Sequence, residues 1–286
     1  MRFLQRFFLL IAMLGLTACG SVKLAYNYAP SLLQYQLDSY LDLTDDQEAL
    51  LTEELVAFQA WHRERALPEY AATLRQWANK LDEPHTFTVP EILEKQKMFE
   101  EDLLVIGQRS ALHLAPLVLT LTPEQRKQLS EEFEASNEEY AEENLGDSSQ
   151  SLEERKERFM ERYERWLGTL TDNQTQTLDD WLAKQPDTAT LWGQERVARQ
   201  QALLEILAQA QDSPSAEQAA VALHDYFQSL SRYRVTALQA QREPRLLALA
   251  GLTVSLLNQM TDRQRRFLQE TLRDYANDFE DLSSST

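Results

Sequence analysis

Leu43-Thr44-Asp45-Asp46-Gln47 is the first of four copies of one pattern: an apolar residue, Thr, two variable residues and Gln. The other copies are Leu121-Thr122-Pro123-Glu124-Gln125, Leu170-Thr171-Asp172-Asn173-Gln174 and Met260-Thr261-Asp262-Arg263-Gln264. The pattern is that of a capping box, in which the Thr hydroxyl accepts a hydrogen bond from the third backbone N–H and the Gln side chain bonds back to the Thr backbone N–H. Each copy therefore predicts a helix that begins directly after its Thr.

The rest of the chain is helical in its periodicity. Leu51, Leu55 and Phe58 recur every 3 to 4 residues, as one face of a helix requires, and β-type alternation is nearly absent. Pro68 predicts a kink or a break in the run 45–81, and further breaks are expected at 82–90, 145–150, 185–188, 212–215 and 242–245. We predict an all-α multi-helix bundle of about nine or ten helices with short links.

The spacing of the four copies indicates an internal duplication. The first copy lies 78 residues before the second, and the third lies 90 residues before the fourth. We interpret the chain as two related helical halves, 31–168 and 169–286, each with two copies. The alternative is an unrepeated all-α domain that carries four independent caps.

The amino terminus has the features of an export signal. Arg2 and Arg6 precede a short apolar stretch that is about half of the ~20 residues needed to span a bilayer, and such a stretch is typical of a signal peptide. Leu16-Thr17-Ala18-Cys19 resembles a bacterial lipobox, which implies removal of residues 1–18 and acylation of Cys19. Gly20 after the Cys then implies sorting to the outer membrane, facing the periplasm, with 19–30 as a lipidated tether. The alternative is an ordinary signal peptide with an incidental buried Cys.

Charge and cysteine content exclude several classes of protein. The 46 acidic and 28 basic residues give a net charge of −18, so the clustered cationic surface that nucleic-acid binding needs is not expected. One Cys excludes an intramolecular disulfide and a Cys-based zinc site. We expect neither nucleic acid nor a metal ion among the partners.

No motif of a known enzyme chemistry is recognisable. The four histidines show no metal-ligand spacing, and there is no Gly-rich phosphate loop or nucleophile motif. Paired carboxylates carry no information in so acidic a chain. We therefore expect no catalytic residue, no metal and no cofactor.

Two local clusters are candidate binding residues. Trp61, His62, Arg63 and Arg65 combine aromatic and cationic side chains, as recognition surfaces do, although aromatic residues at helical spacing are more often core residues. A second cationic group is suited to an anionic ligand or to salt bridges within the protein, and it consists of Arg232, Arg234, Arg242 and Arg245. If Arg63 and Arg65 faced Arg232 and Arg234, the four would form a cationic groove.

Two families share these marks. The LTxxQ motif resembles that of the Spy/CpxP family of small periplasmic helical proteins, which implies helical hairpins and chaperone-like binding. The lipobox, the segment 24–29, the helix with the first LTxxQ copy and Trp61-His62-Arg63 resemble a proteobacterial lipoprotein family of unknown function. The second resemblance covers most of the chain and implies no mechanism.

These observations lead to one functional expectation and two alternatives. We expect an outer-membrane-anchored periplasmic lipoprotein with a non-enzymatic binding or chaperone-like role in the cell envelope. Its expected partners are the membrane, through Cys19, and envelope proteins, which would occupy apolar grooves between helices. The alternatives are an envelope enzyme that acts on peptidoglycan or lipid, and a structural spacer.

Overall fold

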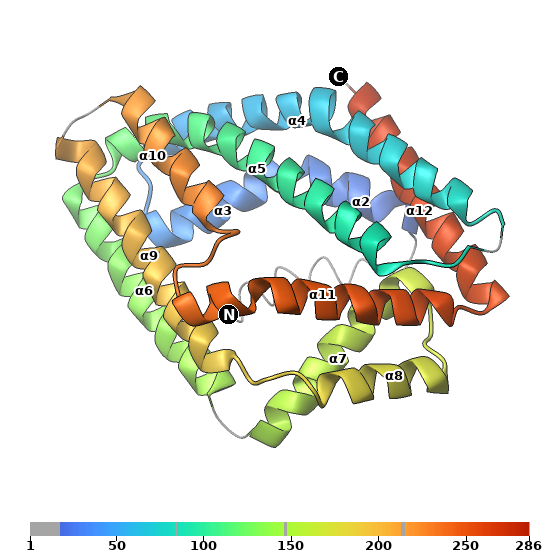
Figure 1. Cartoon of the computed structure of the whole chain (residues 1–286). Coiled ribbons are helices and arrows are strands. Elements are labelled where there is room, and N and C mark those ends of the chain that lie inside the picture. The colour runs from blue at the N-terminus through green and yellow to red at the C-terminus, as the bar shows by residue number, and fades with distance from the viewer. Residues whose placement is uncertain (1–17, 84, 146–147, 213–214, 286) are drawn as a thin grey trace.

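The predicted all-α fold is confirmed. In the computed structural model, which describes residues 18–83, 85–145, 148–212 and 215–285, there are eleven helices and no strand (Figure 1). Their bounds are α2 Ala18–Asn27, α3 Ala29–Leu41, α4 Asp45–Lys80, α5 Val89–Thr120, α6 Pro123–Asn144, α7 Ser148–Leu167, α8 Asp172–Leu182, α9 Ala189–Asp212, α10 Ala216–Ser229, α11 Thr236–Asn258 and α12 Asp262–Ser284.

The amino-terminal expectations are tested only in part. The leader 1–17, with Leu16 and Thr17 of the lipobox, lies outside the described residues, as do the side chains of Ala18 and Cys19. The segment 19–30, which we expect to be a lipidated tether, is helical, because α2 and the first residues of α3 occupy it. This added helix is one reason why the count exceeds nine or ten.

Prolines interrupt fewer helices than expected. α4 continues through Pro68 and α11 through Pro244, so the predicted break at 242–245 is wrong. An internal Pro costs a helix about 3 kcal/mol, and burial on both sides of each Pro offsets that cost. Leu67 and Ala71 flank Pro68 and are almost fully buried; Leu238 and Ala250 are buried on either side of Pro244. The actual break lies earlier, between the end of α10 at Ser229 and the start of α11 at Thr236.

Four helices begin with the predicted capping boxes. α4, α6, α8 and α12 each start directly after the Thr of an LTxxQ copy, with the Thr in an extended conformation. In each, the Thr hydroxyl accepts from the Gln backbone N–H and the Gln side chain accepts from the Thr backbone N–H. The motif is thus a repeated device for starting a helix.

Two hydrophobic clusters form the core. The first gathers leucines and alanines of α3, α4, α5, α6, α9 and α10, and the second gathers residues of α4, α5, α7, α8, α11 and α12 with their links. The long helices α4 and α5 pack against each other and contribute to both clusters. Figure 1 shows α4 along the upper edge of the molecule and α5 below it. Each cluster takes residues from both sides of the 168/169 boundary, so the division into related halves stays a prediction.

α5 is the central helix of this arrangement. It is the one described helix that is long and apolar enough to cross a membrane by length and composition. Only 28% of its apolar window is buried, but Ala111, Ala115 and Leu117 of α5 are buried in the first cluster. α5 also packs against α4, α9, α10 and α11, so we describe it as a core element of the bundle.

Candidate functional site

The first two LTxxQ copies meet at their glutamines. Gln47 Nε2 donates to Gln125 Oε1 at 3.0 Å, and Gln125 Nε2 donates to Gln47 Oε1 at 2.6 Å. Each amide also donates to a backbone carbonyl before the partner's cap, Thr120 O for Gln47 and Asp42 O for Gln125. Both side chains are buried. The pair therefore joins the starts of α4 and α6.

The third and fourth copies meet in a similar way. Gln264 Nε2 donates to Gln174 Oε1 at 2.7 Å and to Thr169 O at 3.0 Å, while Gln174 Nε2 donates to Leu256 O. Gln174 is fully buried and Gln264 nearly so. The motif glutamines thus join the starts of helices inside the protein. Their side-chain amides are engaged in these hydrogen bonds and are not available to a ligand.

His62 and Arg63 lie on α4 where it contacts α2 and the end of α12, whereas the Trp61 ring has the Arg109 guanidinium of α5 5.2 Å from its centroid. The His62 Nδ1 atom is 2.9 Å from the Tyr26 hydroxyl, and the Arg63 guanidinium donates to Asn27 Oδ1 and to the Ser285 carbonyl. Burial lowers the pKa of His62, so its imidazole is neutral at pH 7. Burial raises the pKa of Tyr26 to about 12 despite the nearby Arg63 charge. These contacts hold α2 on the bundle.

The other predicted arginines lie against different elements. Arg65 is exposed beside Glu64 on α4, whereas Arg234 lies in the link between α10 and α11 and stacks over the Tyr226 ring at 6.0 Å. Arg232 belongs to the same link, and its backbone N–H donates to Ser229 O. Arg63 and Arg234 share no partner, so the described contacts do not assemble the cationic groove that we considered.

Glu195 is a buried carboxylate that holds this link. It accepts from the backbone N–H groups of Arg234 at 2.7 Å and Val235 at 2.9 Å, and from Arg199 Nε at 2.6 Å. Desolvation by burial raises the pKa of Glu195, but the Val235, Arg199 and Arg234 hydrogen bonds outweigh it, so the net pKa lies below the ordinary value. Glu195 thus caps the start of α11, which no sequence motif marks.

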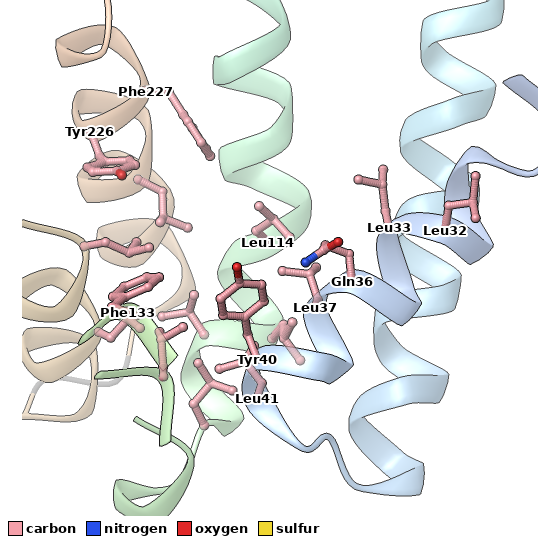
Figure 2. A pocket seen from close by; sticks show the side chains of 17 residues that line it. Leu32, Leu33, Gln36, Leu37, Tyr40, Leu41, Leu114, Phe133, Tyr226 and Phe227 are labelled. Carbon is pink, nitrogen blue, oxygen red and sulfur yellow. The ribbon is translucent and has the colours of Figure 1, made fainter. Parts of the chain in front are cut away.

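An apolar cavity of about 460 Å³ opens between five helices. Figure 2 shows Leu37 and Tyr40 of α3 beside Leu114 of α5, with Leu32 and Leu33 at one end and Tyr226 and Phe227 at the other. The full lining is Leu32, Leu33, Gln36, Leu37, Tyr40, Leu41, Leu114, Leu117, Val118, Leu121, Leu129, Phe133, Leu203, Leu207, Leu223, Tyr226 and Phe227.

Polar groups are few in this cavity. Gln36 and the hydroxyls of Tyr40 and Tyr226 are the only polar side-chain groups of the lining, which contains no His and no charged residue. Burial raises the pKa of the Tyr226 phenol, so the phenol is neutral and able to donate a hydrogen bond. Within the described parts of the chain, no three His, Cys, Asp or Glu side chains converge as a metal would require. The cavity is suited to holding an apolar group.

The sequence pointed to parts of this cavity without predicting it. The stretches 103–114 and 203–207 each carry leucines at helical spacing, and Leu114, Leu203 and Leu207 among them are lining residues. Leu32 and Leu33 were missed, because they follow the expected tether 19–30 and belong to no apolar face that was predicted. The packing of α3 against α6, of α9 against α10 and of α5 against α9 and α10 brings them together.

One comparison with known proteins gives a match. A family of unknown function (DUF6279) matches residues 39–234, more than half of the chain. The matched range contains the first three LTxxQ copies, Trp61-His62-Arg63 and the cavity walls from α5, α6, α9 and α10. Comparison with curated proteins and with solved structures gives no match.

Proposed function

The chain belongs to the DUF6279 family of unknown function, and for this chain we propose a non-enzymatic role as an outer-membrane-anchored periplasmic lipoprotein that binds apolar ligands. The binding site in this proposal is the cavity between α3, α5, α6, α9 and α10. The observation that carries it is the lining of that cavity, which has no charged residue and only three polar side-chain groups.

The proposed anchor is the lipid on Cys19. The lipobox Leu16-Thr17-Ala18-Cys19 and the lone cysteine support it, and several acyl chains hold a protein stably on a membrane. α2 begins at Ala18, so the anchor adjoins a helix that is itself held to the bundle. Lys23 contributes to that hold by pairing with Asp278 and Asp281 of α12. The anchor therefore confines the binding cavity close to the membrane.

The size and chemistry of the cavity support an apolar ligand. Small-molecule sites are mostly apolar clefts of about 300–1,000 Å³ with a few polar groups that orient the ligand. Apolar surface gains roughly 25 cal/mol for each Å² removed from water, whereas a polar group buried here would have few hydrogen-bond partners. Gln36, Tyr40 and Tyr226 are the groups that would orient a bound molecule.

The LTxxQ motifs lend less support to a chaperone role than the cavity lends to ligand binding. The resemblance to the Spy/CpxP family rests on those motifs, and in this chain their glutamines are buried and bonded to each other. Their role here is to join helices. A Spy-like binding surface therefore has no support from the motif residues themselves.

The binding proposal is tested with a neutral apolar dye, N-phenyl-1-naphthylamine, whose emission rises in apolar surroundings. The protein used is 20–286, which lacks the acylated Cys and retains every buried residue of both clusters. We expect saturable dye binding by the wild type. Leu114→Trp, which fills the cavity, should weaken binding at least tenfold.

Leu112→Trp is the matched control, because Leu112 lies two residues away on α5, is half exposed and is not part of the lining. It should bind the dye as the wild type does. Urea unfolding of both variants shows that they are folded. The absence of dye binding by the wild type, or equal binding by Leu114→Trp and the wild type, would refute the proposal.

A further inference from the structure

One face of α2 and α3 exposes a row of large apolar side chains. Leu24, Tyr28, Leu32 and Tyr35 follow one another at steps of 4, 4 and 3 residues, and each is at least 38% exposed. The backbone bonds Tyr28 N–H to Leu24 O and Leu32 N–H to Tyr28 O carry the helical pattern across the junction between the helices. Residues at this spacing share a face.

The opposite face of α2 is fixed to the bundle. Lys23 pairs with Asp278 and Asp281 of α12, while Tyr26 and Asn27 bond to His62 and Arg63 of α4. The apolar row therefore points away from the protein on a helix that is held in place. Isolated exposed leucines are normal on proteins, but a contiguous apolar face marks an interaction site.

The charge of this segment differs from that of the rest of the chain. No Asp or Glu occurs before Asp38, although the whole chain carries 46 acidic residues. The other prominent set of exposed apolar residues, which includes Phe99 and Leu103 of α5, is interleaved with Glu100, Glu101 and Asp102. An acid-free apolar face that follows the anchored Cys is the kind of surface that rests at a membrane interface, with its apolar side among the acyl chains.

The same face borders the mouth of the cavity. Leu32 and Leu33 are 38% and 44% exposed, and both belong to the cavity lining. Figure 2 shows them at one end of the lining, on the first turns of α3. A surface placed against this face would therefore also cover the cavity mouth.

We propose that the outer face of α2 and α3 lies on the lipid bilayer, so that the cavity opens toward the membrane and receives the acyl chain of a lipid from it. This rests on the proposed function, which supplies the acylated Cys19 and the ligand-binding cavity. An acyl chain has no polar group that requires a partner, whereas an extended peptide would bury backbone N–H and C=O groups in a nearly apolar cavity.

The test uses the lone cysteine of the chain. In the mature acylated protein Cys19 is blocked, so a single introduced Cys is the only site that a thiol-reactive nitrobenzoxadiazole dye can label. Leu24→Cys and Leu32→Cys place the dye on the proposed face, and Val56→Cys on α4 and Val197→Cys on α9 place it at apolar positions elsewhere that are at least as exposed. The labelled proteins are reconstituted in vesicles of phosphatidylethanolamine and phosphatidylglycerol that contain doxyl-labelled lipid.

We expect the doxyl lipid to quench the dye at positions 24 and 32 at least threefold more than at positions 56 and 197. Equal quenching at all four positions, in protein that floats with the vesicles, would contradict the proposed contact of α2 and α3 with the bilayer. The proposed anchor on Cys19 would be unaffected by that result. Protein that does not float with the vesicles overturns the anchor and this inference together. A blue shift at position 24 without vesicles that increases with protein concentration means that a second copy of the chain covers the face, which also contradicts the proposal.

Discussion

Where two LTxxQ motifs pair, a glutamine side chain caps its own helix and also bonds to the glutamine that caps the other helix. The Oε1 atom of Gln125 accepts from the Thr122 backbone N–H at its own cap and from Gln47 Nε2 of the other motif, while its Nε2 atom donates across the pair. Glu would form the local capping box equally well, but it would lose the donor and bury a charge. This explains why all four copies end in Gln.

The pairing makes a prediction about Gln125. Gln125→Ala removes the capping partner and leaves the buried amide of Gln47 without its reciprocal bonds, so the free energy of unfolding should fall by about 2–4 kcal/mol. Ser215 is the control, because it caps α10 through one bond to the Gln218 backbone N–H and belongs to no glutamine pair. Ser215→Ala should cost about 1 kcal/mol. Urea denaturation measures both, and equal losses would contradict the account.

Glu195 makes a prediction about pH. Its folded-state pKa lies below the ordinary value of 4.5, so its stabilising effect is complete above that pH and is lost as pH falls through the folded pKa. Glu195→Gln should lower the free energy of unfolding at pH 7 by roughly 1–3 kcal/mol, because it removes the ion pair with Arg199 and replaces one of the two acceptor oxygens by an NH₂ donor. The difference between wild type and variant should shrink below about pH 4.5. A difference that stays constant from pH 7 to pH 3 would contradict this role.

At the scale of the helices, the starts were easier to predict than the interruptions. Thr44, Thr122, Thr171 and Thr261 mark helix starts through bonds to residues three positions away, and such local signals can be read from sequence. The effect of Pro244 depends on packing by residues from other helices, so its local signal predicted a break that does not occur. The start of α11 depends on Glu195, which lies 40 residues before Val235.

Helix packing makes a prediction about two glycines. Gly107 of α5 lies where α10 approaches closely, because a Cβ there would come within 2.9 Å of Phe227 Cβ. Gly251 of α11 has no atom within 4 Å of the same position. Gly107→Ala should therefore destabilise the protein by about 1–2 kcal/mol, whereas Gly251→Ala should stabilise it by about 0.5–1 kcal/mol through helix propensity.

Thermal or urea unfolding of the two variants decides this point. Both substitutions add the same methyl group to a helical glycine, so their helix-propensity gains are similar and the difference reports the contact with Phe227. If Gly107→Ala stabilises the protein as much as Gly251→Ala does, the close approach of α5 and α10 is wrong. Because Phe227 lines the cavity, Gly107→Ala should also weaken binding of the apolar dye.

At the scale of the whole molecule, helix content could be predicted, but the cavity could not. Helical periodicity and the lack of alternating segments are local properties, and they gave the correct fold class. The cavity requires five helices whose lining residues lie between Leu32 and Phe227. No spacing rule relates residues that far apart in one sequence. The same reason explains why Trp61, His62 and Arg63 were considered as binding residues, although the contacts of His62 and Arg63 hold α2 on the bundle and Trp61 lies against Arg109 of α5.

The architecture relates the two proposals to each other. α3 contributes residues to the first cluster, to the cavity and to the apolar row that continues from α2. Its inner side closes the cavity, and its first turns carry Leu32 and Leu33 at the mouth. One helix next to the anchor thus connects the membrane-facing surface that we propose with the ligand site that we propose.

The central claim is that the cavity holds an apolar ligand, and native mass spectrometry of the acylated protein purified from cell envelopes tests it most directly. A ligand in the cavity adds mass under native conditions and leaves on denaturation, whereas acyl groups on Cys19 stay attached because they are covalent. We predict that the wild type and Leu112→Trp carry such a releasable apolar adduct and that Leu114→Trp does not. No releasable adduct on the wild type, or an undiminished adduct on Leu114→Trp, would contradict the claim.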